Sequence, residues 1–329
     1  MSSRFVPMTP DALRAKVLVT DPLHEEALQA LRQGYDVTVR EVPSEELPDV
    51  IEGFDALIVR SRTKVTREVL TRDAGLRVVG RAGAGVDNID VEAATERGIP
   101  VVNAPGGNSQ SVAELAVGLM LSLARRIPEA DRTTKAGRWE KTRLRGGELA
   151  GKVLGLVGSG RVGSLVAQIC QDFGMETVAY DPYVEPVAAQ ERGVSLASLE
   201  QVLKRADFVS VHAALTEETH HLLSGPQLAL MKPTAYLVNV ARGPIVDEEA
   251  LVAALEAEQI AGAALDVFER EPPSGSPLLT MENVVLTPHI GASTDEAQRR
   301  TGLLVVEQVT KALEGDVPEF LVNPEILSV

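Results

Sequence analysis

The segment from Gly151 to Asp181, GKVLGLVGSGRVGSLVAQICQDFGMETVAYD, constrains the fold more than any other part of the chain. An apolar run of strand type leads directly into three glycines with the spacing G-x-G-x-x-G: Gly158, Gly160 and Gly163. The next residues have the apolar spacing of a helix that packs on a sheet: Val162, Leu165, Val166 and Ile169. A second apolar run, 177–180, then ends at Asp181. This order of strand, glycine turn, helix, strand and acid predicts a dinucleotide-binding βαβ unit.

Each conspicuous residue of this segment has a physical reason. A tight turn at Gly158 aims the amides of the helix start at a pyrophosphate, Gly160 lets the backbone approach it, and Gly163 lets helix and strand come close. The carboxylate of Asp181 can accept hydrogen bonds from an adenosine ribose and would repel a 2′-phosphate. No basic residue follows until Arg192, so we expect NAD rather than NADP.

Length, charge and cysteine content limit the number of domains, the kind of binding partner and the redox compartment. A length of 329 residues suggests two domains, since about 150 residues per domain is usual. The net charge of −15 argues against nucleic acid or a membrane surface as partner, so an anionic substrate must be met by local arginines. Cys170 is the single cysteine, which excludes disulfides within the chain and fits a reducing cytoplasm. We expect Cys170 to be a packed apolar residue, and we expect no metal site.

Alternating strands and helices predict parallel sheets covered on both faces. The first hundred residues form one such unit, and a Pro and Gly cluster at 103–108 is a natural hinge. Residues 109–125 predict a long apolar helix, buried in the core or in a subunit interface, and 128–147 are a polar excursion. The last helix, 294–313, stops at Gly315. The N-terminal residues lack a signal-peptide core, and 112–124 is too short to span a bilayer.

Polar residues follow three later strands of the second unit. Because ligands bind outside the carboxyl ends of parallel strands, Arg242, Glu271 and His289 should converge on one crevice. The imidazole suits a base that takes the proton of a hydroxyl as hydride leaves for a nicotinamide, and the carboxylate would orient it. The guanidinium can hold a substrate carboxylate. His212, His220 and His221 compete for the base role, and spacing alone leaves that choice open.

Four segments in the second half, GSGRVG with its acid, VNVARGPIVDEEAL, AGAALDVFEREPP and TPHIGAS, resemble the signature segments of the D-isomer-specific 2-hydroxyacid dehydrogenases, in family order. The first-half segments RSRTKVT, GRAGAGVDNID and NAPGGNSQSVAEL are most similar to the branch formed by the D-3-phosphoglycerate dehydrogenases. The resemblance implies two doubly wound parallel-sheet α/β domains, a Rossmann dinucleotide-binding domain and a flavodoxin-like substrate domain. It also implies the catalytic set Arg242, Glu271 and His289.

Residue by residue, the resemblance implies two binding sets. The cofactor would contact the glycine turn, the acid after it and residues along the later strand ends: Ala84, Gly158, Gly160, Arg161, Val162, Gly163, Asp181, Ala213, Val240, Ala241, Arg242, Asp266, His289, Gly291 and Ala292. The substrate carboxylate and phosphate would be held mainly by first-half residues: Arg60, Ser61, Arg62, Arg81, Ala84, Gly85 and Asn108, with Arg242 and His289.

The family pattern further implies that residues 1–104 and 296–329 form a discontinuous substrate-binding domain, with 105–295 as the dinucleotide-binding domain. Closure about the two crossings would exclude water. A homodimer or homotetramer is implied, with the helix at 109–125 and the excursion around Trp139 at the interface. Long phosphoglycerate dehydrogenases carry a C-terminal regulatory domain that binds serine, and none is expected here.

The function implied is NAD-dependent oxidation of 3-phosphoglycerate to 3-phosphohydroxypyruvate, the entry to serine biosynthesis. The nearest alternative is a glyoxylate or hydroxypyruvate reductase of the same family, which needs no phosphate clamp. A non-enzymatic NAD sensor acting as a corepressor is the alternative from another class. The complete set of Arg242, Glu271 and His289 argues against it.

Overall fold

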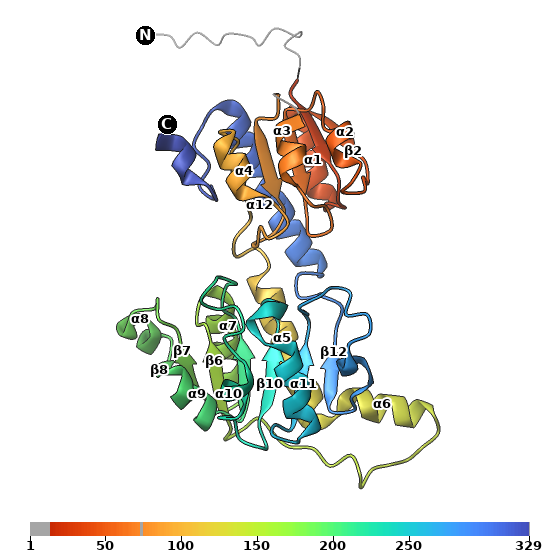
Figure 1. Cartoon of the computed structure of the whole chain (residues 1–329), viewed down its shortest axis with the longest axis vertical. Coiled ribbons are helices and arrows are strands. Elements are labelled where there is room, and N and C mark those ends of the chain that lie inside the picture. The colour runs from red at the N-terminus through yellow and green to blue at the C-terminus, as the bar shows by residue number, and fades with distance from the viewer. Residues whose placement is uncertain (1–13, 73–74, 329) are drawn as a thin grey trace. The chain divides into compact units, whose positions relative to one another are not determined.

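Two separate parallel sheets organise the chain, one in each of two units (Figure 1). The computed structural model describes residues 14–72 and 75–328. The N-terminal segment 1–13, where the sequence predicts no signal peptide, lies outside them. The first unit holds the described residues up to Asn108 and from Asp295 onward, and the second runs from Ser109 to Thr294. The boundaries expected from the sequence were 104/105 and 295/296.

The first unit is a five-stranded parallel sheet in the order β2-β1-β3-β4-β5. Its strands are β1 (Lys16–Val19), β2 (Asp36–Val39), β3 (Ala56–Val59), β4 (Val78–Arg81) and β5 (Val101–Val102). Its helices are α1 (Glu25–Gly34), α2 (Leu47–Val50), α3 (Arg67–Arg72), α4 (Val91–Glu96) and α12 (Asp295–Glu314), with a 3-10 turn at Pro324–Ser328. This is the flavodoxin-like strand order, as expected.

The last helix belongs to the first unit because one glycine lets it lie directly on the sheet. A Cβ on Gly80 in β4 would come within 2.5 Å of a methyl group of Val309 and 3.0 Å of one of Val305. Both valines are buried on the apolar stripe predicted for this helix. The helix ends as predicted, with Gly315 at a φ of +87°.

The second unit is a seven-stranded parallel sheet in the order β12-β11-β10-β9-β6-β7-β8. Its strands are β6 (Val153–Val157), β7 (Glu176–Tyr180), β8 (Ser195–Leu196), β9 (Phe208–Val211), β10 (Tyr236–Asn239), β11 (Gly262–Leu265) and β12 (Val284–Leu286). Its helices are α5 (Ser109–Arg125), α6 (Ile127–Lys135), α7 (Arg161–Asp172), α8 (Pro186–Glu191), α9 (Leu199–Arg205), α10 (Gly225–Leu228) and α11 (Glu248–Glu256), with 3-10 turns at Gly243–Ile245 and Pro277–Thr280. The order is that of a Rossmann sheet with one strand added. The chain adds β7 and β8 on one side of β6 and then places β9 on the other side, so the topological switch point lies between β6 and β9.

The core of the second unit confirms the predicted helix faces. Val166 of α7 is buried, and Val162, Leu165 and Ile169 pack against the same cluster. Helix α5 lies against α7 and against β10, β11 and β12, which explains why it is apolar on most sides. Residues 128–147, predicted to be an excursion, include α6 and an extended loop that projects from the rest of the unit (Figure 1). Within residues 14–72 and 75–328, no helix combines the length and apolar character needed to cross a bilayer.

Candidate active site

The glycine turn after β6 has the shape that a pyrophosphate requires. Gly158 has a φ of +94°, and a Cβ there would lie 2.8 Å from the backbone N of Ala213. A Cβ on Gly163 would lie 2.3 Å from the carbonyl oxygen of Gly158, so only glycine allows α7 to approach the turn this closely. Gly160 is the N-cap of α7 and faces open space. The amides that begin α7 are therefore accessible to an anionic group.

Asp181 has a second task that the sequence did not indicate. Its Oδ2 accepts a hydrogen bond from the Ser159 backbone N–H at 2.7 Å and one from Ser159 Oγ at 3.2 Å. Its Oδ1 accepts from the Tyr183 N–H at 3.1 Å. The carboxylate thus fixes the glycine turn, and Oδ1, which accepts a single bond, has a further lone pair for a ribose hydroxyl.

A pocket of about 590 Å³ opens beside the turn, at the carboxyl ends of β6, β7 and β9. This is the switch point of the sheet, where α/β folds bind ligands. Four of its lining residues are predicted cofactor contacts: Gly158, Gly160, Asp181 and Ala213. The sequence missed most of the others, chiefly Tyr180, Tyr183, Val184, Thr216, Glu218, Thr219 and Leu222. The loop after β9 supplies several of these, and its position next to the glycine turn is the signal that could have identified it.

The pocket predicts how cofactor preference depends on Asp181. Asp181→Asn removes the charge but keeps an oxygen for the Ser159 N–H, whereas Asp181→Ala removes both. We expect both variants to raise kcat/KM for NADP relative to NAD by about tenfold, and Asp181→Ala alone to weaken NAD strongly through the loosened turn. Steady-state kinetics with both cofactors measures this. An unchanged preference in both variants would show that the carboxylate does not select the cofactor.

The structure brings two of the predicted catalytic side chains into direct contact. His289 Nδ1 lies 2.8 Å from Glu271 Oε2, although the residues are 18 apart in sequence. Their side chains are 42% and 39% exposed, so both are open to a ligand. His289 has a φ of +53°, which is unusual for a residue other than glycine and is often found at functional sites. The bond leaves Nε2 of the imidazole for a substrate.

Backbone packing places the loop that carries Arg242 beside the segment that leads to Glu271. A Cβ on Gly243 would lie 1.9 Å from the carbonyl carbon of Phe268, so the loop after β10 rests directly on the loop after β11. The side chain of Asn239 fixes this loop by donating to the Arg242 carbonyl oxygen at 2.9 Å. Partial burial would raise the pKa of Glu271, but the bond to His289, the Phe268 N–H and the charge of Arg242 lower the pKa below its ordinary value. Glu271 is therefore ionised at neutral pH.

Asp266, predicted to be a cofactor contact, holds the loop that carries His289. It is buried, and its Oδ1 accepts from Thr287 Oγ1 at 2.7 Å and from the Ile290 N–H at 2.8 Å. Its Oδ2 accepts from the Gly291 N–H at 2.8 Å. These bonds, with the Asp266 carbonyl accepting from the His289 N–H at 2.8 Å, maintain the left-handed backbone of His289.

His212 competed with His289 for the base role, and its surroundings separate the two. Its Nε2 lies 2.9 Å from Ser210 Oγ, and its Nδ1 is buried without a hydrogen-bond partner. Although the residue retains some exposure, burial of the ring lowers its pKa from 6.5 to about 3. His212 is a poor base at neutral pH and packs beneath the glycine turn.

This burial predicts acid sensitivity. Below pH 6.5 the unfolded chain takes up a proton at His212 and the folded chain does not until pH falls to about 3. The stability that the neutral ring provides is therefore complete above 6.5 and is lost as pH falls, by roughly 2 kcal/mol near pH 5. We expect the free energy of unfolding, measured in urea, to depend less on pH over this range in His212→Gln than in wild type. His220→Gln is the control and should follow the wild-type pH dependence. Parallel pH curves for all three proteins would contradict the assignment.

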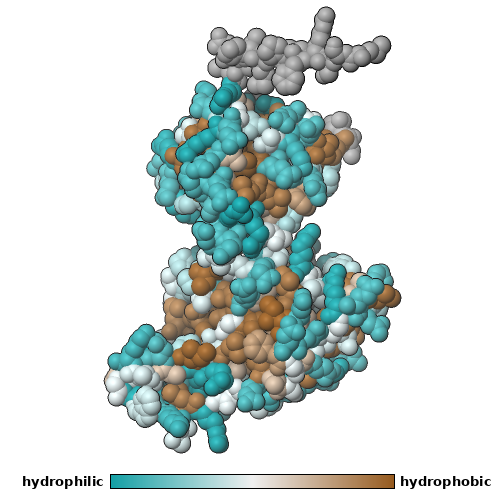
Figure 2. All heavy atoms as spheres, turned by 180° about the vertical axis from the view of Figure 1, so that it is seen from behind, coloured by the Kyte–Doolittle hydropathy of each residue, from teal (hydrophilic) through white to brown (hydrophobic). Residues whose placement is uncertain are grey.

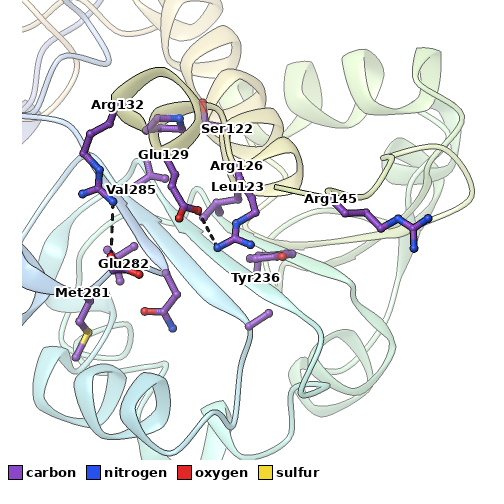
Figure 3. A pocket seen from close by; sticks show the side chains of 14 residues that line it. Ser122, Leu123, Arg126, Glu129, Arg132, Arg145, Tyr236, Met281, Glu282 and Val285 are labelled. Atoms are coloured by element: carbon purple, nitrogen blue, oxygen red, sulfur yellow. Dashed lines mark ion pairs between the residues drawn. The ribbon is translucent and has the colours of Figure 1, made fainter. Parts of the chain in front are cut away.

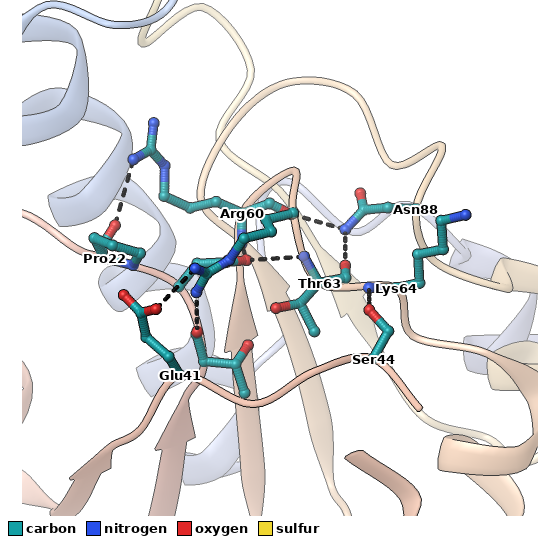
Figure 4. Close-up of polar contacts among 10 residues, drawn as sticks. Pro22, Glu41, Ser44, Arg60, Thr63, Lys64 and Asn88 are labelled. Atoms are coloured by element: carbon teal, nitrogen blue, oxygen red, sulfur yellow. Dashed lines mark hydrogen bonds and ion pairs between the residues drawn. The ribbon is translucent and has the colours of Figure 1, made fainter. Parts of the chain in front are cut away.

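The predicted substrate residues of the first unit lie at the end of β4 and on the loops that follow β3 and β4, with Asn108 at the end of the unit. The two arginines on the loop after β3 differ in their contacts (Figure 4). Arg62 is held by acids, with Nε 3.0 Å from Asp21 Oδ1 and Nη1 2.9 Å from Glu41 Oε2. Arg60 reaches the Pro22 carbonyl oxygen at 3.4 Å, and burial lowers its pKa against the opposing charge of Asp21. Arg60 is therefore the more available cation.

The other predicted residues lie as follows. Arg81 ends β4, and a Cβ on Gly83 would lie 1.5 Å from its Nη1, so its guanidinium covers the glycine loop that contains Ala84 and Gly85. Arg161 and Val162 begin α7. In the second unit, the loops beside the catalytic residues carry Val240, Ala241, Gly291 and Ala292.

A second pocket in the second unit has a volume of about 440 Å³ and lies at the amino ends of the strands (Figure 3). It is lined by Tyr236 and Val284, where β10 and β12 begin, and by the end of α5. Arg126 pairs with Glu129 at 2.7 Å, and Arg132 lies 3.7 Å from Glu282. Because parallel strands present His289 and Arg242 at their other ends, this pocket is separate from the catalytic residues.

Comparisons with known proteins agree with this geometry. A family model described as the NAD binding domain of D-isomer specific 2-hydroxyacid dehydrogenases matches residues 117–291. The chain is 51% identical over 310 residues to a D-3-phosphoglycerate dehydrogenase of Methanocaldococcus jannaschii, covering 94% of this chain and 59% of that protein. It is 46% identical over 305 residues to a hydroxypyruvate reductase of Thermotoga maritima, covering 91% of this chain and 99% of that protein.

A solved structure of a Thermus thermophilus protein is similar at a TM-score of 0.87 and 41% identity, covering 93% of this chain and 99% of that one. The chain spans less than three fifths of the length of the first curated phosphoglycerate dehydrogenases that it matches. The expected fold class and the predicted NAD cofactor are confirmed. The chain belongs to the D-isomer-specific 2-hydroxyacid dehydrogenase family and carries its NAD-binding domain.

Proposed function

We propose that this protein oxidises 3-phosphoglycerate to 3-phosphohydroxypyruvate with NAD, the entry to serine biosynthesis. The observation that carries the proposal is the 2.8 Å contact between His289 and Glu271, with the Arg242 loop packed against the segment that bears the glutamate. Curated relatives that are 44–51% identical are named D-3-phosphoglycerate dehydrogenase, which supports the choice of substrate.

The catalytic side chains divide the chemistry in the following way. His289 Nε2 takes the proton of the C2 hydroxyl as the C2–H bond breaks, and Glu271 on Nδ1 stabilises the imidazolium that forms. Arg242 holds the substrate carboxylate and polarises the C2 oxygen. NAD, when bound at the glycine turn, would supply the nicotinamide ring that receives the hydride from C2. In the reverse direction His289 returns the proton to the C2 oxygen.

We assign the substrate phosphate to Arg60, with Arg81 at the end of the neighbouring strand β4. Asp21 accepts from the Arg60 N–H at 2.6 Å and from the Thr63 N–H at 3.3 Å, and Asn88 Nδ2 donates to the Arg60 carbonyl oxygen at 2.7 Å. The backbone of this loop is therefore fixed while the Arg60 guanidinium stays available. Local positive charge of this kind compensates for the net charge of −15.

A hydroxypyruvate or glyoxylate reductase is the second candidate, and the two ion pairs of Arg62 favour it. Glu41 and Asp21 both neutralise Arg62, which reduces the charge left for a phosphate. The hydroxypyruvate reductase of Thermotoga maritima, which this chain matches over 99% of its length, supports the same alternative.

Charge removal at Arg60 separates the two candidates. We expect Arg60→Gln to lower kcat/KM for 3-phosphoglycerate about tenfold to a hundredfold, because a charge-assisted contact to phosphate is lost, and to leave an unphosphorylated 2-hydroxy acid within about twofold. Arg62→Gln is the matched comparison and should have the smaller effect. Wild-type protein that reduces NAD with another 2-hydroxy acid, and never with 3-phosphoglycerate, would overturn the substrate.

We also propose that the protein is a cytoplasmic homodimer or homotetramer that associates through α5 and the projecting segment. Trp139 and Ile127 on that segment are 84% and 49% exposed. Figure 2 shows hydrophobic residues gathered on one face of the second unit. An exposed apolar face of this kind is typical of a subunit interface.

A further inference from the structure

One cluster of reactive side chains in the second unit lies outside the proposed catalytic set. His221 Nε2 lies 2.8 Å from Glu269 Oε1, and His221 Nδ1 lies 3.9 Å from Asp247 Oδ2. The three side chains come from three different segments, and each is about one-third exposed. Potential ligand atoms of the three residues lie within 4.8 Å of one another.

The arrangement suits an imidazole bridge better than a metal ion. The two ring nitrogens face different carboxylates, whereas a single ion binds an imidazole through only one nitrogen. Glu269 Oε1 also accepts from the Glu248 N–H at 3.0 Å, and the Glu269 N–H donates to Glu248 Oε2 at 3.3 Å. The carboxylate of Glu269 is therefore already employed in joining chain segments.

The backbone around His221 is held on both sides. The His221 N–H donates to the Pro244 carbonyl oxygen at 2.8 Å, and the backbone of Leu223 bonds to Ile245 and Asp247. His221 has a φ of +52°, a left-handed conformation that costs energy for a residue other than glycine. The side-chain bond to Glu269 and the backbone bond to Pro244 compensate for that cost.

The cluster stands between the cofactor pocket and the catalytic loops. Thr219 and Leu222, on either side of the two histidines, line the 590 Å³ pocket, and Glu269 does not. Glu269 precedes the catalytic Glu271 by two residues, and its backbone N would lie 2.4 Å from a Cβ on Gly243, directly after Arg242. A displacement of Glu269 would therefore move both catalytic loops.

We propose that His221 and Glu269 form a clamp that positions Glu271 and links it to the wall of the cofactor pocket. Both are positioning residues, since neither belongs to the catalytic set. The inference rests on the proposed function, because Glu271 matters only if His289 acts as a base.

Glu269→Ala, His221→Ala and the double variant test the clamp through kcat, KM for NAD and thermal unfolding. We expect each single variant to lower kcat and raise KM for NAD by about three- to tenfold, and the double variant to be no worse than the worse single, because residues in direct contact are not additive. Glu269→Gln keeps the acceptor oxygen and should restore most of both constants. Glu256→Ala, an exposed carboxylate on α11, is the control and should match wild type.

Three results are distinguishable. An unchanged KM for NAD in Glu269→Ala, or additive losses in the double variant, would overturn the clamp while wild-type turnover stands. The clamp would also be overturned if a lowered unfolding temperature accounted for the whole change in kcat and KM for NAD and if Glu269→Gln did not restore these constants. Wild-type protein that binds NAD by calorimetry but oxidises no 2-hydroxy acid would instead refute the proposed function.

Discussion

His289→Ala is expected to lower kcat by about 10³-fold while NAD affinity, measured by calorimetry, stays within about twofold, because a positioned general base contributes on this order. The imidazole contacts Glu271, its backbone N–H is held by Asp266, and the residue does not line the pocket beside the glycine turn. Removing it should therefore remove proton transfer without disturbing the adenosine side.

The control for His289→Ala is His212→Ala, the other histidine at a strand end. Since the His212 ring is buried and its pKa is lowered to about 3, its loss should act on stability and NAD binding rather than on the chemical step. Ordinary turnover by His289→Ala would contradict the assignment of the base.

Arg242→Gln is expected to lower kcat/KM by about 10²- to 10³-fold, as does the loss of one donor that stabilises developing charge. Arg242→Lys should restore little, because an ammonium group cannot reproduce the planar bidentate fork. Steady-state kinetics in both directions measures this. Arg205→Gln, a surface arginine that pairs with Glu176, is the control. If Arg242→Gln kept a kcat/KM near that of wild type, a residue other than Arg242 would hold the substrate carboxylate.

The sequence predicted much of the fold because its signals were local. The glycine turn, the face of α7 and the bounds of α5 follow from apolar spacing and glycine positions within single segments. The run RVV at 77–79 predicts a strand, and the strand is found at Val78–Arg81, an ordinary shift of a strand end. Short elements such as β8 and α10 were missed, because two to four residues carry no periodicity.

The site was predictable only in part. That Arg242, Glu271 and His289 lie at strand ends follows from the strand pattern, and their convergence follows from the parallel sheet. Pairings across long sequence distances could not be predicted. The neutralisation of Arg62 by Asp21 and Glu41, the bond from Ser159 to Asp181 and the clamp between His221 and Glu269 each depend on the folded arrangement.

The burial of the histidine rings also could not be predicted from the sequence. His212 and His289 both follow apolar strands, and nothing in their flanking residues distinguishes a buried ring from an accessible one. In the structure, tertiary contacts distinguish them: His212 packs under the glycine turn, whereas His289 stands on a loop with a carboxylate partner.

The most direct test of the whole account is transfer of deuterium from C2 of a labelled D-2-hydroxy acid to the nicotinamide ring, followed by mass spectrometry of the reduced cofactor. We expect label in the reduced NAD produced by wild-type protein with 3-phosphoglycerate, and label that accumulates about 10³-fold more slowly with His289→Ala. Absence of label from wild-type protein with every D-2-hydroxy acid tried, phosphorylated or not, would contradict the claim that these side chains serve hydride transfer.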